Sequence, residues 1–392
     1  MSLNSKRRYA MFPEAYKAGV LASQIPTSTV GDFTVVRTTT SGNGATRVNK
    51  EGFIEQVPDN VPRLDYSDGG CPKLLTEASS ENLITYSEDF SDGSWNKSSV
   101  NITPNEDISP SGGNNATRLS ISSAGGNLFK QPNIIGTGMV ISFYVKSNGA
   151  SKDNFVLRLG SGAGSTSQIL TATNEWVRYS FYKESIDANV AGIRNVIGEE
   201  VDILIFGAQL EQKPQATSYI PTNGSTEQRG TETIANAGDA STFNSVSGVL
   251  FADFKHNESN DFSTISLSDG TTTNRVYLGK NSVNQMRMLI AGSGNISTID
   301  FNYDFELQNK VAGIYDSNQT LYINGIKIET KTSPNIVGLN SAQFNSGAGS
   351  SLMNGKTKSV QHFDYLTDEE MEKLTGYDSY DQMVSQFNFT TL

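Results

Sequence analysis

The sequence contains few of the residues that build metal centres and nucleophilic active sites. Among 392 residues there are one cysteine and two histidines. A structural zinc site needs about four clustered nitrogen or sulfur ligands, and Cys71, His256 and His362 are too few and do not all fall in one predicted module. The single cysteine excludes an intrachain disulfide, so stability must come from packed cores and from oligomerisation. We expect Cys71, which precedes Pro72, to be a small packed residue and not a reactive thiol.

The chain also lacks an excess of basic charge and long apolar runs. Its net charge is −11 and its pI is about 4.8. An acidic chain repels phosphate backbones, so we expect no nucleic-acid partner. The first residues, MSLNSKRRYAMFPEAY, begin with basic residues but lack the apolar segment of a signal peptide. No apolar run approaches the length that spans a membrane, so we expect no membrane partner and synthesis in a cytoplasm.

The residues that are abundant favour β structure. The chain has 36 glycines, many Ser, Thr and Asn residues, and only 18% charged residues. This composition is typical of many short strands joined by turns. We predict an all-β chain with two tandem antiparallel β-sandwiches of the jelly-roll type. An irregular N-terminal attachment region precedes them, and short C-terminal helices follow.

The first predicted region is residues 1–79. It contains only short extended pieces and too few apolar residues for a core of its own. We therefore predict that it serves attachment or oligomerisation. The candidate attachment residues are Arg7, Arg8, Tyr9 and Phe12. The basic residues fit a solvated chain terminus equally well, and this alternative stays open.

The first predicted sandwich is residues 80–229. Strand-like apolar runs, separated by segments rich in Gly, Ser and Asn, lie at 139–145, 154–159, 176–182 and 201–206. Because no helices alternate with these runs, a sandwich is favoured over a parallel sheet. The glycines at 160–165 follow a strand, but no Lys-Ser/Thr pair or helix follows them. They are predicted to form a sandwich loop and not a phosphate-binding loop.

The second predicted sandwich is residues 230–376, and residues 377–392 are predicted as a C-terminal helical tail. Asn324-Gly325 is a type I′ turn dipeptide between two alternating strands. Thr367 and Glu370 have the spacing of a capping box, and Gly376 is expected to end that helix as a C′ residue. The last residues, FNFTTL, are apolar enough to need a partner surface.

Several segments resemble one class of protein. The run from Pro62 to Trp95 contains PRLDYS, CPKLL, NL and YSEDF in that order. It resembles the module-joining segment of bacteriophage virion proteins of the tail-fibre and head-fibre type. ATRVNKEGFIEQV, at 45–57, resembles a segment that lies just upstream of this join in the same proteins.

Two further segments resemble sugar-binding domains. GAQLEQKPQATSYIPT, at 207–222, is similar to the closing strand and tail of carbohydrate-binding-module-like domains of phage structural proteins. Lys213-Pro214 stands where glycine is common in those domains, so a different turn is expected. LYINGIKI, at 321–328, resembles a hairpin of laminin-G and concanavalin-A-like lectin domains.

The resemblance implies a structural and adhesive role. The chain would form a homotrimeric fibre or spike on the virion, contact other virion proteins and adhere to host-surface glycans. It would be made in the cytoplasm of the host bacterium, without enzymatic activity and without a cofactor. Two alternatives stay open: a glycan-degrading enzyme with binding modules, and a purely structural decoration protein without a ligand.

Residue-level candidates for chemistry are weak. Glycoside hydrolysis needs two acids across a sugar, but acid pairs are common in an acidic chain, so no catalytic residue is assigned. The pairs are Glu88-Asp89, Glu199-Glu200 and Asp300/Asp304.

Calcium is the only metal for which ligands can be suggested. Asp253, Asn260 and Asp261 are the candidates, although the chain has no D-x-D-x-D-G loop and turn capping explains them better. Glycan binding would use exposed aromatic side chains. Trp95 and Trp176 are expected to pack in the core, which leaves the candidates Tyr144, Tyr182 and Tyr277.

Overall fold

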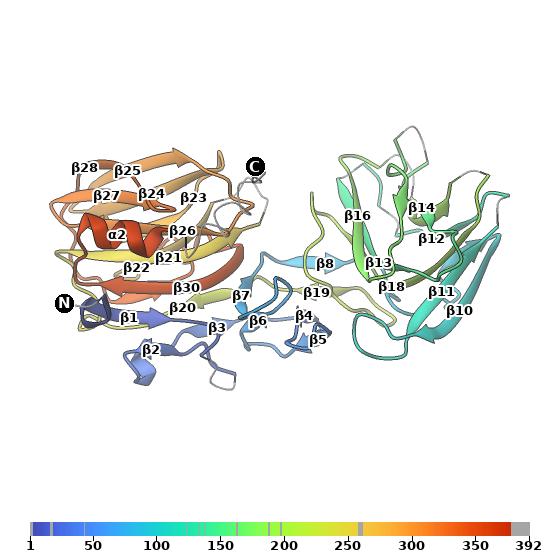
Figure 1. The fold of residues 1–392 in the computed structure, drawn as a ribbon, viewed down its shortest axis with the longest axis horizontal. Coiled ribbons are helices and arrows are strands. Elements are labelled where there is room, and N and C mark those ends of the chain that lie inside the picture. Colours follow the sequence, from blue (N-terminus) through green and yellow to red (C-terminus); the bar gives the residue numbers. More distant parts are fainter. Residues whose placement is uncertain are drawn as a thin grey trace, which may run out of the picture. The chain divides into compact units, whose positions relative to one another are not determined.

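The computed structural model describes residues 3–15, 19–42, 44–122, 124–132, 134–136, 138–161, 164–186, 189–196, 198–257 and 262–377 (Figure 1). Its regular structure is almost entirely β, which confirms the predicted all-β class. The chain forms two compact units. Unit 1 comprises Met1–Arg37, Asn60–Ala78 and Glu232–Leu392, and unit 2 comprises Thr38–Asp59 and Ser79–Thr231. No helix among the described residues is long and apolar enough to cross a membrane.

The chain passes between the two units after Arg37, Asp59, Ala78 and Thr231. The predicted boundaries at residues 80 and 230 fall beside the last two of these crossings. The segment 1–79 does not form a separate region, because its residues are divided between the units. The physical reason is its small apolar content: the strands Arg7–Met11 and Lys73–Thr76 gain burial by pairing with the strand Gly355–Phe363 of unit 1, and Ile54 packs with Phe206 in unit 2.

One sheet of unit 1 joins strands from both ends of the sequence. Its antiparallel order is β2 (Ser23–Ile25), β1 (Arg7–Met11), β30 (Gly355–Phe363), β21 (Gly248–His256), β26 (Asn309–Tyr315), β27 (Asn318–Ile323) and β28 (Ile326–Thr332). In addition, β7 (Lys73–Thr76) pairs with β30 and β6 (Arg63–Asp65) pairs with β7. The 1–79 segment thus extends this sheet by several strands.

The facing sheet of unit 1 has the order β25 (Asn295–Asn302), β24 (Gln285–Gly292), β23 (Arg275–Lys280), β22 (Ser263–Ser268) and β29 (Ser341–Gln343). Buried apolar side chains of both sheets form the core, among them Leu250, Phe254, Ile265 and Met288. The small pair of β20 (Thr233–Ala235) and β3 (Thr34–Val36) adds to this unit. Short helices α1 (Leu3–Lys6) and η1 (Thr29–Gly31) flank β1 and β2.

Helix α2 (Asp368–Thr375) covers the other face of the first sheet. Met371 packs there with Val249 and Phe251 of β21. The predicted capping box is present, since the Thr367 side chain accepts from Glu370 N and the Glu370 side chain accepts from Thr367 N. Gly376 ends the helix with φ −67°, so it is not the left-handed C′ residue that was predicted. The tail predicted at 377–392 lies outside the described residues beyond Tyr377.

The β27–β28 hairpin confirms the turn prediction. Asn324 and Gly325 have φ of 49° and 84°. Both values are positive, as a type I′ turn requires, and this is why Asn-Gly suits the position.

Unit 2 is a second sandwich. One sheet has the order β10 (Val100–Asp107), β11 (Ala116–Ile121), β18 (Val201–Glu211), β13 (Met139–Ser147) and β16 (Val177–Lys183). The facing sheet has the order β15 (Leu170–Thr171), β14 (Asn154–Leu159), β17 (Ala191–Asn195), β12 (Asn127–Lys130) and β9 (Asn96–Ser98). Two small pairs complete the unit: β8 (Ser80–Asn82) with β19 (Glu227–Arg229), and β4 (Ala45–Val48) with β5 (Ile54–Val57).

The core of unit 2 lies between its two large sheets, and Trp95 is buried there as predicted. Trp176 is not in this core. It is half-buried in a separate cluster with Ile54, Phe206 and Tyr219, and its indole N–H donates to the Ile108 carbonyl oxygen at 3.0 Å. The residues around Ile54 therefore form a second, smaller apolar cluster in unit 2.

Candidate ligand-binding pocket

Two of the motif segments found in the sequence lie side by side in unit 2. Tyr86, from YSEDF, forms a β-bridge with Asn223, which follows YIPT. The Thr222 backbone N–H donates to Ser87 Oγ at 2.8 Å, and Ser87 Oγ also shares a hydrogen bond of 2.7 Å with the Tyr219 hydroxyl. Residues more than 130 positions apart thus form one small structural element.

These segments line a pocket of about 400 Å³. A volume of this size is in the lower range for small-ligand sites, which hold roughly 300–1,000 Å³. Contributions come from Ser41, from β5, from YSEDF and from residues 221–227, which end in the first residue of β19, all within unit 2. The lining residues are Ser41, Gln56, Tyr86, Glu88, Asp89, Pro221, Thr222, Asn223, Ser225 and Glu227.

Glu88 is held in a fixed position. Its Oε1 accepts from the Tyr219 hydroxyl at 3.0 Å, and its Oε2 accepts from Asn115 Nδ2 at 3.2 Å. Burial raises the pKa of Glu88 above its ordinary value, although these two hydrogen bonds act in the opposite direction. The carboxylate is therefore oriented by its neighbours before any ligand arrives.

Two more carboxylates belong to the pocket wall. Asp89 Oδ1 accepts from the backbone N–H of Ser91 at 3.0 Å, which fixes the turn after YSEDF. Glu227 is 6% exposed, and its Oε1 accepts from Ser41 N at 2.9 Å. The described lining residues include three acids and no Lys, Arg or His. Such a pocket favours a neutral or positively charged ligand over an anion.

The Tyr86 ring is fixed by a buried cation. Lys130 Nζ lies 5.3 Å from the centroid of Tyr86 and 4.9 Å from that of Trp95. It also contacts Ser94 Oγ and donates to Thr85 Oγ1 at 3.4 Å. Burial lowers the pKa of Lys130 to about 8. The aromatic residue in the pocket wall is thus tied to the core by ring–cation contacts.

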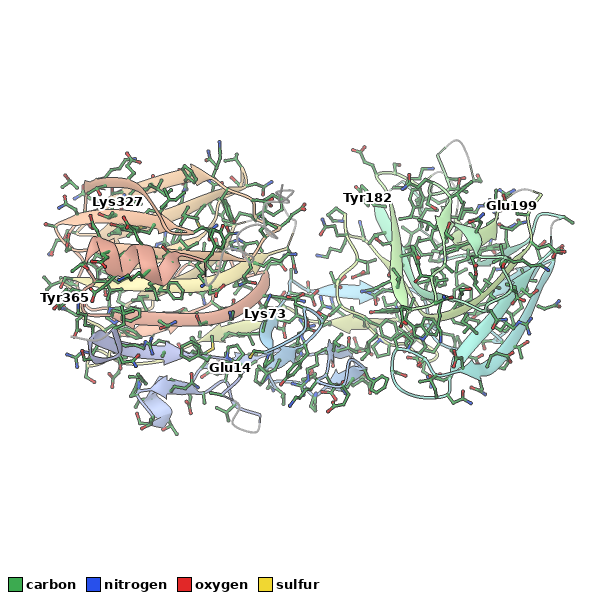
Figure 2. All side chains as sticks on the ribbon, viewed as in Figure 1. Glu14, Lys73, Tyr182, Glu199, Lys327 and Tyr365 are labelled. Atoms are coloured by element: carbon green, nitrogen blue, oxygen red, sulfur yellow. The ribbon has the colours of Figure 1, made fainter. Side chains whose placement is uncertain are left out.

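The other predicted acid pairs lie elsewhere and have partners. Glu199 is exposed on unit 2 (Figure 2) and accepts from Asn154 Nδ2 at 3.2 Å. Glu200 pairs with Lys152 at 2.5 Å, and Asp300 pairs with Arg287 at 2.6 Å. Only the pair Glu88-Asp89 lines the pocket. The spacing of this pair does not distinguish it from other acids of the chain, and its place inside YSEDF is the sequence signal that does.

The predicted attachment residues belong to strand β1 of unit 1 or follow it. Tyr9 is fully buried in the core. The Arg7 guanidinium lies over the rings of Phe363 and Phe12, at 5.4 and 6.0 Å. Arg8 is the most exposed of the four and pairs with Asp364 at 2.6 Å. Because β1 is paired on both sides, Tyr9 stabilises the sheet and has no free surface for a partner.

The candidate calcium ligands do not form a described site. Asp253 is buried in β21, and its Oδ1 accepts from Gln308 Nε2 at 2.6 Å. Asn260 and Asp261 lie outside the described residues. Among the residues that are described, no group of three or more His, Cys, Asp or Glu side chains could hold a metal ion.

The remaining candidates are mostly structural. His256 and His362 are buried in unit 1, and burial lowers their pKa values to about 3 and about 4. Cys71 is exposed, so the expectation of a packed residue was wrong. The carboxylate of Glu14 (Figure 2) raises the pKa of the Cys71 thiol, which disfavours the reactive thiolate.

The candidate tyrosines differ in exposure. Tyr277 is 4% exposed, and Tyr144 is half-buried beside Phe206. Tyr182 (Figure 2) is 42% exposed on the edge strand β16 and is not among the residues that line the pocket. None of the three therefore contributes to the pocket wall. Tyr86, which the sequence analysis did not single out as a ligand contact, is the aromatic residue there.

Comparison with known proteins identifies no family. No family model matches the chain, and no curated protein matches it. Among solved structures, the CBM40 module of the Ruminococcus gnavus IT-sialidase, bound to α2,3-sialyllactose, is 21% identical over 34% of this chain and 83% of that one, with a TM-score of 0.30. Domain 4 of the arabinanase AbnA from Geobacillus stearothermophilus, in complex with arabinotriose, is 13% identical over 37% and 73%, also with a TM-score of 0.30. Scores this low support no conclusion about function.

Proposed function

We propose that the protein is a structural and adhesive component of a bacteriophage particle, a fibre or spike that binds host-surface glycans through the pocket in unit 2. One observation carries the proposal. The segments that resemble phage virion proteins, YSEDF and YIPT, are bonded to each other and line the same pocket. A motif that only joined modules would not need to place Tyr86, Glu88 and Asp89 around an open cavity.

The lining chemistry suits a sugar. Carboxylate, amide and hydroxyl groups orient ligand hydroxyls, and an aromatic ring provides an apolar surface. The acidic wall favours neutral or amine-bearing sugars and disfavours sialylated or other anionic glycans. We expect each site to be weak on its own. A homotrimer that presents several copies would gain avidity by effective concentration.

A glycan array with the purified chain tests the binding proposal. We expect signal on neutral or amino sugars, and Tyr86→Ala should lower affinity by about tenfold or more, because an aromatic contact contributes roughly 1 kcal/mol beyond its buried area. Asp89→Asn keeps an acceptor for the Ser91 turn and removes one charge, so its loss of affinity should be larger for amine-bearing sugars.

Tyr182→Ala is the matched control, since Tyr182 is an exposed tyrosine of the same unit outside the pocket. An array without signal, measured with a multivalent presentation of the chain, would favour the purely structural alternative. Loss of binding in the Tyr182 variant but not in the Tyr86 variant would place any glycan site elsewhere.

The particle and the assembly are tested separately. Gold-labelled antibodies against the chain should decorate virions, and light scattering of the purified chain should give the mass of a trimer. A monomeric, fully folded chain would count against the fibre. We also expect no depolymerisation of host polysaccharide, and release of reducing ends by the pure chain would support the enzyme alternative.

A further inference from the structure

An open apolar groove of about 970 Å³ lies on unit 1. It is formed by the end of β25, the loop that follows, and the β27–β28 hairpin. Its lining residues are Phe301, Asn302, Tyr303, Asp304, Phe305, Glu306, Leu307, Asn309, Ile323, Asn324, Ile326, Ile328 and Tyr377. Two of the apolar side chains are strongly exposed, Phe301 at 42% and Ile326 at 64%. Soluble proteins rarely leave a contiguous apolar surface of this kind exposed to water. Such a surface is typically the binding site of another segment or another molecule.

The chain leaves helix α2 at the rim of this groove. Gly325 N donates to Thr375 Oγ1 at 3.1 Å, and Lys310 Nζ donates to the Gly376 carbonyl oxygen at 3.0 Å. Gly325 lies between Asn324 and Ile326, which both line the groove. The next residue, Tyr377, is itself part of the groove wall. The end of α2 and the last described residue, Tyr377, therefore lie at this groove.

The following residues have a suitable composition. Residues 378–392 read DSYDQMVSQFNFTTL and contain Tyr, Met, Val, two Phe and Leu with only two charges. Fifteen residues reach up to about 50 Å when extended, so every part of the groove is within reach. We propose that residues 378–392 of the same chain occupy this groove, with Phe387 and Phe389 supplying the apolar contacts.

Limited chymotrypsin digestion of the full chain tests the proposal, because cleavage after Phe387 and Phe389 follows the fraction of time that the segment is released. In the parent chain we expect slow cleavage. Ile326→Asp places a charge in the groove and should accelerate cleavage by about tenfold or more. Ile296→Asp is the matched control, since Ile296 is 65% exposed on β25 but does not line the groove, and its cleavage rate should equal that of the parent.

Phe301→Ser provides a second groove variant, and circular dichroism checks that all variants remain folded. A free peptide of residues 378–392 gives the rate of the unprotected segment. The proposal is overturned if the parent chain is cleaved as fast as this peptide, or if Ile326→Asp and Ile296→Asp behave alike. It is also overturned if protection disappears on dilution, because a segment from a second copy would then be the occupant. A tethered segment acts at an effective concentration of about 1 mM and keeps its protection at any dilution.

Discussion

Glu232→Gln is the most informative stability test of unit 1. Glu232 accepts from Arg37 Nη1 and Arg63 Nε, both at 2.8 Å, and from the backbone N–H of Glu77 at 3.0 Å. Arg63 Nη1 also pairs with Glu77 at 2.9 Å. These four side chains are at most 6% exposed. Burial alone would lower the pKa of Arg63, but the two carboxylates outweigh it and raise that pKa, so the guanidinium stays charged.

The loss of unfolding free energy in Glu232→Gln can be estimated from the buried charges that lose their partner. The amide that replaces the Glu232 carboxylate would carry no charge, so two buried guanidinium groups would face a single carboxylate. Breaking a buried ion pair by removing one partner costs about 3–5 kcal/mol. Total domain stabilities are about 5–15 kcal/mol, so a large part of the stability of unit 1 should be lost. We expect a correspondingly lower urea midpoint.

The assay can separate the two units. Trp95 and Trp176, the two tryptophans of the sequence, both lie in unit 2, so tryptophan emission reports on that unit, whereas far-UV circular dichroism reports on both. Glu232→Gln should shift the circular-dichroism transition more than the fluorescence transition. Glu329→Gln is the control, since Glu329 forms an exposed pair with Lys331 and should cost less than about 1 kcal/mol. Equal small shifts for both variants would refute the reasoning.

Two further predictions concern pH. Burial lowers the pKa of Lys130 from 10.5 to about 8. The unfolded chain therefore binds more protons than the folded chain between pH 8 and pH 10.5, and the stability of unit 2 rises with pH across that window. Lys130→Met should therefore raise the free energy of unfolding at pH 7 by about 1 kcal/mol, because solvent screens part of the charge and the lost ring and hydroxyl contacts offset part of the gain. Urea titrations should show this gain shrink as the pH rises toward 10.5. His256 and His362 have folded pKa values of about 3 and about 4, below 6.5, so the unfolded chain binds more protons in this window and unit 1 should lose stability as the pH falls from 6.5 to 4. In His256→Gln the urea midpoint should depend less on pH, and an unchanged dependence would contradict the assignment.

Local sequence signals predicted local structure well. The Asn324-Gly325 turn and the Thr367 capping box occur as expected, because each depends on hydrogen bonds between residues close in the chain. The strand runs at 139–145, 154–159 and 201–206 also lie within strands. Period-two alternation and β-branched content are properties of the segment itself, so they can be recognised without knowing the partner strand.

Long-range pairing could not be predicted in this way. β1 pairs with β30, about 350 residues later in the sequence, and this pairing buries Tyr9. Nothing in RRYAM distinguishes a paired inner strand from a basic chain terminus. The same holds for the pocket, because Ser41, Tyr86 and Glu227 come together only through tertiary contacts. The exposure of Cys71 likewise depends on neighbours that are distant in sequence.

The residues beside the crossings of the chain belong to two groups of interacting side chains. Arg37, Glu77 and Glu232 each stand within two residues of a crossing on the unit 1 side, and they belong to one buried ionic cluster. Ser41 follows the first crossing and Glu227 precedes the last, and both line the pocket on the unit 2 side. A substitution near a crossing therefore acts on the ionic cluster or on the pocket, depending on which side of the crossing it falls. The segment 62–95 contributes to both groups, with Arg63 and Glu77 in the ionic cluster and Tyr86 and Glu88 in the pocket wall.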